Sequence, residues 1–212
     1  MRYITANVRD ICIGHNSRPI IVQSMCNCDT NDIDSAVAQC VKLYEAGSMM
    51  VRLTTQGLRE VESLRNIKAR LHSMGIRIPL VADVHFSSEV AIAAASVADK
   101  VRINPGNFAK DHEVARREFK RFLKECSKYG TAVRIGINHG SLGSRITELY
   151  GNTPKGMQEA MSEWVQMCID EDFYNVVLSL KASNVPVMTQ AYILLQQWME
   201  ERGIIFPLHL GV

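Results

Sequence analysis

The chain alternates between strand-like and helix-like segments, and this alternation restricts the fold to the α/β class. Seven runs of 7–10 residues, rich in β-branched and apolar side chains, predict buried strands. They cover residues 19–25, 48–55, 78–86, 99–107, 131–140, 175–183 and 206–212. Amphipathic periodicity and capping residues predict helices between them. These cover residues 30–46, 58–74, 89–98, 111–129, 154–170 and 187–202. Such alternation implies parallel strands joined by right-handed crossovers.

The length of the repeating unit favours a barrel. The predicted strands end near residues 24 and 210 at the two extremes, so six units span 186 residues and average 31 each. A (β/α)8 barrel of about 250 residues has the same average. An open doubly wound sheet shares the local pattern, but no G-x-G-x-x-G motif follows the first strand. We therefore predict one TIM-type barrel domain over residues 1–212, incomplete, with about seven of its eight units.

Composition excludes several classes of protein. Hydrophobic residues make up 47% of the 212 residues and the net charge is +2, which is typical of a globular chain and does not predict a nucleic-acid surface. No apolar run approaches about 20 residues, and the first ten residues are too polar for a secretory signal. We expect a cytoplasmic protein without a membrane partner. Cys26 and Cys28 are the only close cysteine pair, and we expect both to be unligated thiols, with no metal site.

Alternation along the strands places polar side chains on the face opposite the helices. Residues i and i+2 of a strand share a face, and the outer face of a barrel is apolar because helices cover it. With Val101 and Ile103 outward, Arg102 and Asn104 point into the lumen. The same reasoning on four other strands places further polar residues inside: Arg52, Thr54, Asp83, His85, Arg134, Asn138, Ser179, Lys181 and Ser183.

The predicted lumen carries a surplus of positive charge. Four cations face one carboxylate, a net charge of +3, whereas the whole chain has +2. These residues are Arg52, Arg102, Arg134 and Lys181, against Asp83. Unpaired buried cations cost several kcal/mol each, so either an anionic ligand or internal salt bridges must compensate them. The surplus favours a ligand, and guanidinium groups suit phosphate. We expect a phosphorylated or diphosphorylated ligand at the carboxyl ends of the strands, where barrel active sites lie.

Two histidines and one turn leave more than one interpretation open. His85 follows Asp83 by two positions and is a candidate ligand contact, an acid or base, or a satisfied interior histidine. His139, at a strand end, has the same alternatives. The turn at residues 104–107 either offers backbone N–H groups to an anion or is an ordinary strand-to-helix loop.

Six motifs in order give the chain a specific resemblance. They are VQSM (22–25), PLVADVHF (79–86), VRINPGN (101–107), VRIGINHGSL (133–142), LKASN (180–184) and PLHLGV (207–212). From about residue 11 to its last residue the chain resembles the barrel domain of the 4-hydroxy-3-methylbut-2-enyl diphosphate synthase family (IspG/GcpE type), in its long three-domain form. The resemblance implies an oxidoreductase of the methylerythritol phosphate pathway of isoprenoid biosynthesis. Its substrate would be 2-C-methyl-D-erythritol 2,4-cyclodiphosphate.

The resemblance also implies residue roles. Arg52, Arg102, Arg134 and Lys181 would hold the diphosphate. The diphosphate or the ligand hydroxyls would also be contacted by Asp83, Asn104 and Asn138. His85 and Ser183 would support these three residues. A four-iron four-sulfur cluster in a separate domain, reduced by ferredoxin or flavodoxin, would supply two electrons.

The chain departs from the family pattern in two ways. Cys26 and Cys28 stand where the family usually has threonines, so they are not expected to be cluster ligands. The catalytic glutamate, the closing strand, the insert domain and the cluster domain of the family are expected beyond Val212, which predicts a fragment that is inactive alone. Unpaired sheet edges predict either a homodimer or a rearranged edge. The alternatives are a cluster-free phosphate-binding barrel enzyme, pteroate-synthase-like or aldolase-like, and a non-catalytic phosphate-binding module.

Overall fold

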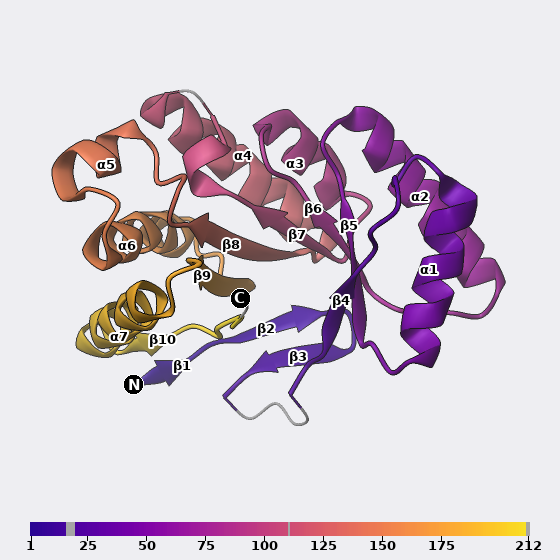
Figure 1. The fold of residues 1–212 in the computed structure, drawn as a ribbon, viewed down its shortest axis with the longest axis horizontal. Coiled ribbons are helices and arrows are strands. Elements are labelled where there is room, and N and C mark those ends of the chain that lie inside the picture. The colour runs from indigo at the N-terminus through magenta and orange to yellow at the C-terminus, as the bar shows by residue number, and fades with distance from the viewer. Residues whose placement is uncertain (16–19, 110, 211–212) are drawn as a thin grey trace.

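A curved parallel sheet forms the centre of the molecule (Figure 1). The computed structural model describes residues 1–15, 20–109 and 111–210. Within them, six parallel strands are hydrogen-bonded in chain order, as the alternating pattern predicts. These are β4 (Gln23–Met25), β5 (Met50–Thr54), β6 (Leu80–Asp83), β7 (Lys100–Ile103), β8 (Ala132–Asn138) and β9 (Val176–Lys181). The unbroken order without reversal is that of a barrel rather than a doubly wound sheet.

The last predicted strand is present only as an isolated bridge. Leu208 bridges to Leu178 in parallel fashion. The amide of Leu178 donates to the carbonyl of Pro207 at 2.9 Å, and that of His209 donates to the carbonyl of Leu178 at 2.8 Å. Residues 211 and 212 of the predicted strand 206–212, and residue 19 of the predicted strand 19–25, lie outside the described residues. The described sheet is therefore a half-barrel of six strands plus this bridged segment.

Helices cover the outer face of the sheet (Figure 1). They are α1 (Ile33–Glu45), α2 (Leu58–Ser73), α3 (Ser88–Ala95), α4 (His112–Tyr129), α5 (Ser144–Tyr150), α6 (Pro154–Asp170) and α7 (Val185–Glu201). Side-chain caps begin several of them; for example, Asp111 accepts from the amides of Glu113 and Val114. Two details differ from the prediction. The short helix α5 was not predicted, and Pro105–Asn107 form a 3₁₀ turn rather than the end of a strand, because proline at the first position favours that turn.

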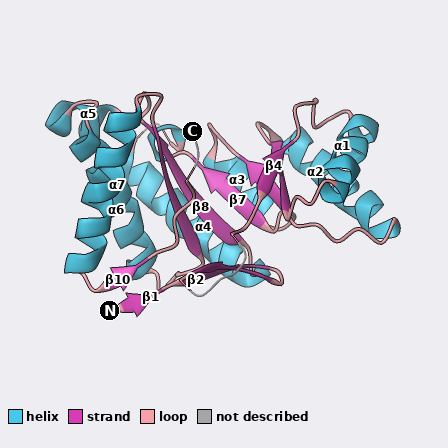
Figure 2. Cartoon of the chain, turned by 60° about the horizontal axis from the view of Figure 1, so that its bottom comes forward, coloured by secondary structure: helices cyan, strands magenta, loops and turns pink. Residues whose placement is uncertain are grey.

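The first 14 residues form two small sheets that the pattern did not predict. β1 (Arg2–Tyr3) pairs in parallel with β10 (Ile204–Ile205), and β2 (Thr5–Val8) forms an antiparallel hairpin with β3 (Ile11–Gly14). Figure 2 shows β2 passing beneath the lower end of β8. Val8 packs there in a small apolar cluster with residues at the amino-terminal ends of three strands, Met50, Val81 and Ala132. The hairpin therefore closes the amino-terminal end of the half-barrel and leaves the carboxyl end for a ligand.

Candidate functional site

Three neighbouring strands bring the predicted lumen residues into one layer. Asp83 of β6 is in register with Arg102 of β7, and Arg102 is in register with Arg134 of β8. Register neighbours in a parallel sheet point to the same face, so the three side chains share the concave side. All three are buried, and Arg134 is 0% exposed. The apolar neighbours Val101 and Val133 pack in the core under the helices, in agreement with the alternation.

Asp83 is the carboxylate at the centre of this layer. Its oxygens lie 3.2 Å from Nη1 of Arg102, 3.6 Å from Nε of Arg52 and 3.0 Å from Nε2 of His85. Burial acts to raise the pKa of Asp83, but the hydrogen bond from His85 and the charges of Arg102 and Arg52 outweigh it and lower the pKa to about 2. Asp83 is therefore ionised at neutral pH, and its charge is shared among three partners.

His85 lies between an acceptor and a donor. Its Nε2 is also 2.7 Å from Nη1 of Arg102. One nitrogen cannot accept from Arg102 and donate to Asp83 at the same time, so the two contacts belong to different protonation or tautomeric states. The structure thus places His85 just beyond the end of β6, in contact with both Asp83 and Arg102.

Arg102 is fixed by its surroundings but not fully satisfied. Its Nη2 donates to the carbonyl of Gly136 at 3.2 Å, whereas its Nε has no hydrogen-bond partner in the described part of the chain. A Cβ at position 136 would lie 2.6 Å from that Nε, so β8 needs glycine where it passes the guanidinium. Burial lowers the pKa of Arg102, and the charge of Asp83 only partly offsets this effect.

Arg134 is the least compensated arginine of the layer. Its Nη2 donates to the hydroxyl of Ser179 at 2.9 Å. Its Nε and Nη1 have no partner among the described residues, and no described carboxylate forms a salt bridge with it. Burial, with the charges of Arg102 and Arg52, lowers the pKa of Arg134 to about 9. The protein thus holds a cation in its interior with N–H groups that lack acceptors.

The outer residues lie at the carboxyl ends of the strands. Asn138 and Lys181 are register neighbours, both half-buried, and burial together with Arg134, Arg52 and Arg102 lowers the pKa of Lys181. Ser183 lies beyond the end of β9, is exposed, and makes no hydrogen bond within the described ranges. The structure therefore does not bring Ser183 against the buried layer.

Asn104 follows β7 and joins two loops. Its Nδ2 donates to the hydroxyl of Ser141 at 3.1 Å, while its Oδ1 is buried without a partner among the described residues. The turn after it is closely packed, since a Cβ at Gly106 would lie 1.9 Å from the carbonyl oxygen of Ser141. The amides of Asn107 and Phe108 donate within the turn, to the carbonyls of Asn104 and Pro105. These two amides are therefore not available to an anion.

His139 has a structural partner. Its Nε2 is 2.8 Å from the carbonyl oxygen of Asn152, which can only accept. The ring therefore donates to the loop before α6, and of the alternatives that the sequence leaves open the structure supports the histidine satisfied by a protein partner.

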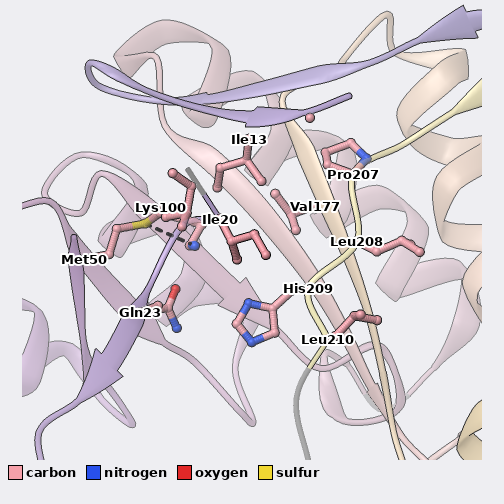
Figure 3. Close-up of a pocket in the computed structure, with 12 residues that line it drawn as sticks. Ile13, Ile20, Gln23, Met50, Lys100, Val177, Pro207, Leu208, His209 and Leu210 are labelled. Atoms are coloured by element: carbon pink, nitrogen blue, oxygen red, sulfur yellow. Dashed lines mark hydrogen bonds between the residues drawn. The ribbon is translucent and has the colours of Figure 1, made fainter. Parts of the chain in front are cut away.

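Two further lumen residues, Lys100 and His209, were not among the predicted site residues. Lys100 precedes Arg102 by two residues on β7 and is 1% exposed, so the alternation that found Arg102 also applies to it. Lys100, His209 and Gln23 line a cavity of about 650 Å³ between the start of β4 and residues 207–210 (Figure 3). Burial and nearby cations lower the pKa of His209 to about 3, so that ring is neutral at physiological pH. The lumen thus holds one more cation than the sequence predicted.

The sequence also matches a known protein family. Residues 4–212 match the GcpE TIM-barrel domain family. The chain belongs to this family. It is 49% identical to 4-hydroxy-3-methylbut-2-en-1-yl diphosphate synthase (flavodoxin) of Bacteroides fragilis strain YCH46, over 97% of the chain and 36% of that protein. It is 44% identical to the ferredoxin form of Parasynechococcus marenigrum, over 98% of the chain and 56% of that protein. This GcpE-family chain therefore spans between about a third and just over half the length of these relatives.

Solved structures with the same fold share little sequence with this GcpE-family chain. A dihydropteroate synthase of Coxiella burnetii superposes with a TM-score of 0.57 at 15% identity, covering 98% of the chain and 77% of that structure. A truncated 3-deoxy-D-arabino-heptulosonate 7-phosphate synthase of Thermotoga maritima gives 0.54 at 13% identity, covering 90% and 64%. At such identities the likeness shows the barrel fold alone.

The described residues do not form a ligand set for an iron–sulfur cluster. They contain no group of three or more His, Cys, Asp or Glu side chains able to hold a metal ion. All six cysteines are free thiols, and the closest pair, Cys26 and Cys40, has its sulfur atoms 3.7 Å apart. No helix of the described chain is long and apolar enough to cross a bilayer.

Proposed function

We propose that this chain is the substrate-binding barrel of an iron–sulfur reductase. The reaction is the conversion of 2-C-methyl-D-erythritol 2,4-cyclodiphosphate into 4-hydroxy-3-methylbut-2-enyl diphosphate, a step of isoprenoid biosynthesis. The names of the relatives support the product. The observation that carries the proposal is the buried cationic layer, in which the guanidinium groups of Arg102 and Arg134 keep N–H groups without an acceptor.

Charge balance explains why the ligand is a diphosphate. Asp83 is already shared by Arg52, Arg102 and His85, so it leaves Arg134 and Lys181 without a carboxylate in the described lumen. A ligand with two negative phosphates compensates these cations and supplies acceptors to the free N–H groups. Arginine is suited to this role because its planar group presents several donors in a fixed geometry.

The remaining polar groups suit the sugar-derived part of the ligand. The unpaired Oδ1 of Asn104 accepts from a hydroxyl, and Asn138 provides a further amide at the end of β8. Asp83 keeps Arg52 and Arg102 in position, and His85 contacts both Asp83 and Arg102 through Nε2.

Reduction requires a group that these residues do not hold. The names of the relatives indicate flavodoxin or ferredoxin as the electron donor. In the proposed enzyme, residues outside those described would hold a four-iron four-sulfur cluster, and this cluster would supply the two electrons. We further propose that the protein acts as a homodimer. The residues described here bind and orient the substrate, and we expect no turnover from this chain alone. The fold likeness to pteroate synthases favours no other function, because it rests on the barrel alone.

Replacing Arg134 tests the proposal. Arg134→Ala removes the least compensated guanidinium, so we expect the affinity for the cyclodiphosphate to fall at least about tenfold, the loss of one charge-assisted contact or more. Isothermal titration calorimetry measures it. Arg65→Ala is the matched control, because that arginine lies on the surface with its side chain 54% exposed. Equal affinities of the wild-type protein and Arg134→Ala would remove Arg134 from the site.

A further inference from the structure

Lys100 is a buried cation with no described anionic partner. Its ammonium contacts Sδ of Met50 at 3.4 Å, and no carboxylate of the described chain forms a salt bridge with it (Figure 3). A buried ammonium without a counter-ion is costly, and a methionine sulfur is only a weak acceptor. The lysine therefore stands in an environment that does not stabilise its charge.

The surroundings of Lys100 contain cations and apolar groups. Its register neighbours are Val81 and Ala132, and the hairpin below contributes Ile13 to the same cavity. Val177 faces it from β9, while β4 contributes Gln23, whose Oε1 has no described partner. No acidic side chain lines this cavity in the described residues.

The charged groups near Lys100 come from higher in the lumen. Arg102 lies two residues further along the same strand, and Arg134 lies two residues beyond its neighbour Ala132, so both are roughly 7 Å nearer the mouth. Arg52 of β5 also acts on Lys100. Asp83 is the only carboxylate in the layer above among the described residues, and it is already engaged by three partners. His209, across the cavity, is neutral because its pKa is about 3.

We propose that Lys100 is a positioning residue for the anion site, a buried lysine beneath Arg134 whose positive charge strengthens the attraction of the layer for a diphosphate bound above it. This inference rests on the proposed function. Lys100 does not touch the ligand; it acts through its charge, which strengthens the attraction of the layer for a polyanion. Its burial among cations keeps that charge conditional on the ligand.

The sign of the pH dependence follows from the pKa of Lys100. Burial, with Arg134 and Arg52, lowers this pKa from 10.5 to about 7 in the free protein. A bound anion opposes that lowering, so the pKa rises in the complex and binding takes up a proton. Below pH 6 the lysine is protonated in both states and affinity does not change with pH. Above pH 7 the affinity falls, by at most tenfold per pH unit, until the pKa of the complex is passed.

Two substitutions at one position separate charge from structure. Lys100→Met is nearly isosteric and neutral, whereas Lys100→Arg introduces a guanidinium, which loses its proton less readily than an ammonium. The probe is the cyclodiphosphate, in which each phosphorus carries one ester and one anhydride bond, so neither phosphate has a proton that titrates near neutral pH. Calorimetry from pH 6 to pH 9 gives the affinity, and two buffers of different ionisation enthalpy give the proton uptake. Lys181 and His85 remain in all three proteins, so the difference between profiles isolates Lys100.

At pH 6 we expect Lys100→Met to bind the cyclodiphosphate about tenfold to a hundredfold more weakly than the wild-type protein. This is the effect of removing one charge that lies one layer of side chains below the bound anion, at an effective dielectric constant of about 20. The two profiles converge toward pH 9, and the variant takes up less proton at pH 7. Lys100→Arg loses less affinity between pH 6 and pH 9 than the wild-type protein does. Matching profiles for wild type and a folded Lys100→Met would overturn the role of Lys100 while leaving the site intact. Failure of the wild-type protein to bind would overturn the proposed function, and this inference with it.

Discussion

Gly136 is a residue whose absence of a side chain has a clear structural reason. A Cβ at position 136 would lie only 2.6 Å from Nε of Arg102, so the guanidinium leaves no room for a side chain there. Glycine in a strand interior normally costs stability because it loses more backbone freedom on folding than other residues. The strand accepts this cost because the lumen needs the arginine in that place.

Gly136→Ala tests this relationship between neighbouring strands. The added methyl displaces Arg102, so we expect a loss of about 1–3 kcal/mol of stability from overpacking, in spite of the better strand propensity of alanine. Weaker cyclodiphosphate binding should accompany it. Gly140→Ala is the control, because a Cβ there meets nothing within 4 Å. Urea unfolding and calorimetry measure both effects, and equal behaviour of the two variants would show that Arg102 is not held by this contact.

Most of the buried site was predictable at the level of single residues. Period-2 alternation predicted Arg102 and Arg134 inside because the outer face of β7 and β8 must be apolar against the helices. The same alternation places Lys100 on the face of Arg102, two residues earlier in β7, although Lys100 was not among the predicted lumen residues. The exposure of Ser183 was not predictable, since alternation has no meaning past the end of a strand. The partner of His139, the carbonyl of Asn152, lies in a loop that no periodicity describes.

The hairpin β2–β3 shows what the pattern of elements could not predict. Its two strands have four residues each, too few for a clear alternation, and its central turn contains Arg9 with a φ of 55° rather than a glycine. The parallel strands were predictable because their apolar runs are longer and are bounded by helices. Tertiary contacts hold the hairpin instead: the side-chain amide of Asn175 accepts from the amide of Asn7 at 2.7 Å and donates to its carbonyl at 3.1 Å.

Val8→Ala tests whether the hairpin closes the amino-terminal end of the half-barrel. Val8 is fully buried against Met50, Val81 and Ala132, so we expect its truncation to cost about 2 kcal/mol through lost burial and the remaining cavity. Val22→Ala is the matched control, because Val22 is 54% exposed and should change stability by less than about 0.5 kcal/mol. Equal unfolding midpoints for the two variants would contradict a role for the hairpin as a plug.

At the scale of the whole molecule, the two ends of the lumen differ in character. The amino-terminal end is closed by apolar side chains of the hairpin, whereas the carboxyl ends of β8 and β9 present Asn138 and Lys181. The described sheet does not close on itself, since a cavity separates β4 from residues 207–210. The repeat length of 31 residues predicted this architecture correctly because each strand and its helix bury one another as a unit.

The central claim is that this cationic lumen binds a cyclic diphosphate. The most direct test is a calorimetric titration of the wild-type chain with 2-C-methyl-D-erythritol 2,4-cyclodiphosphate at pH 6 and fixed ionic strength, beside the same titration with sulfate. We predict saturable binding of one cyclodiphosphate per chain, at least about tenfold tighter than that of sulfate, because two phosphates engage the layer whereas sulfate engages only part of it. Equal affinity for both anions, or no binding of the cyclodiphosphate, would contradict it.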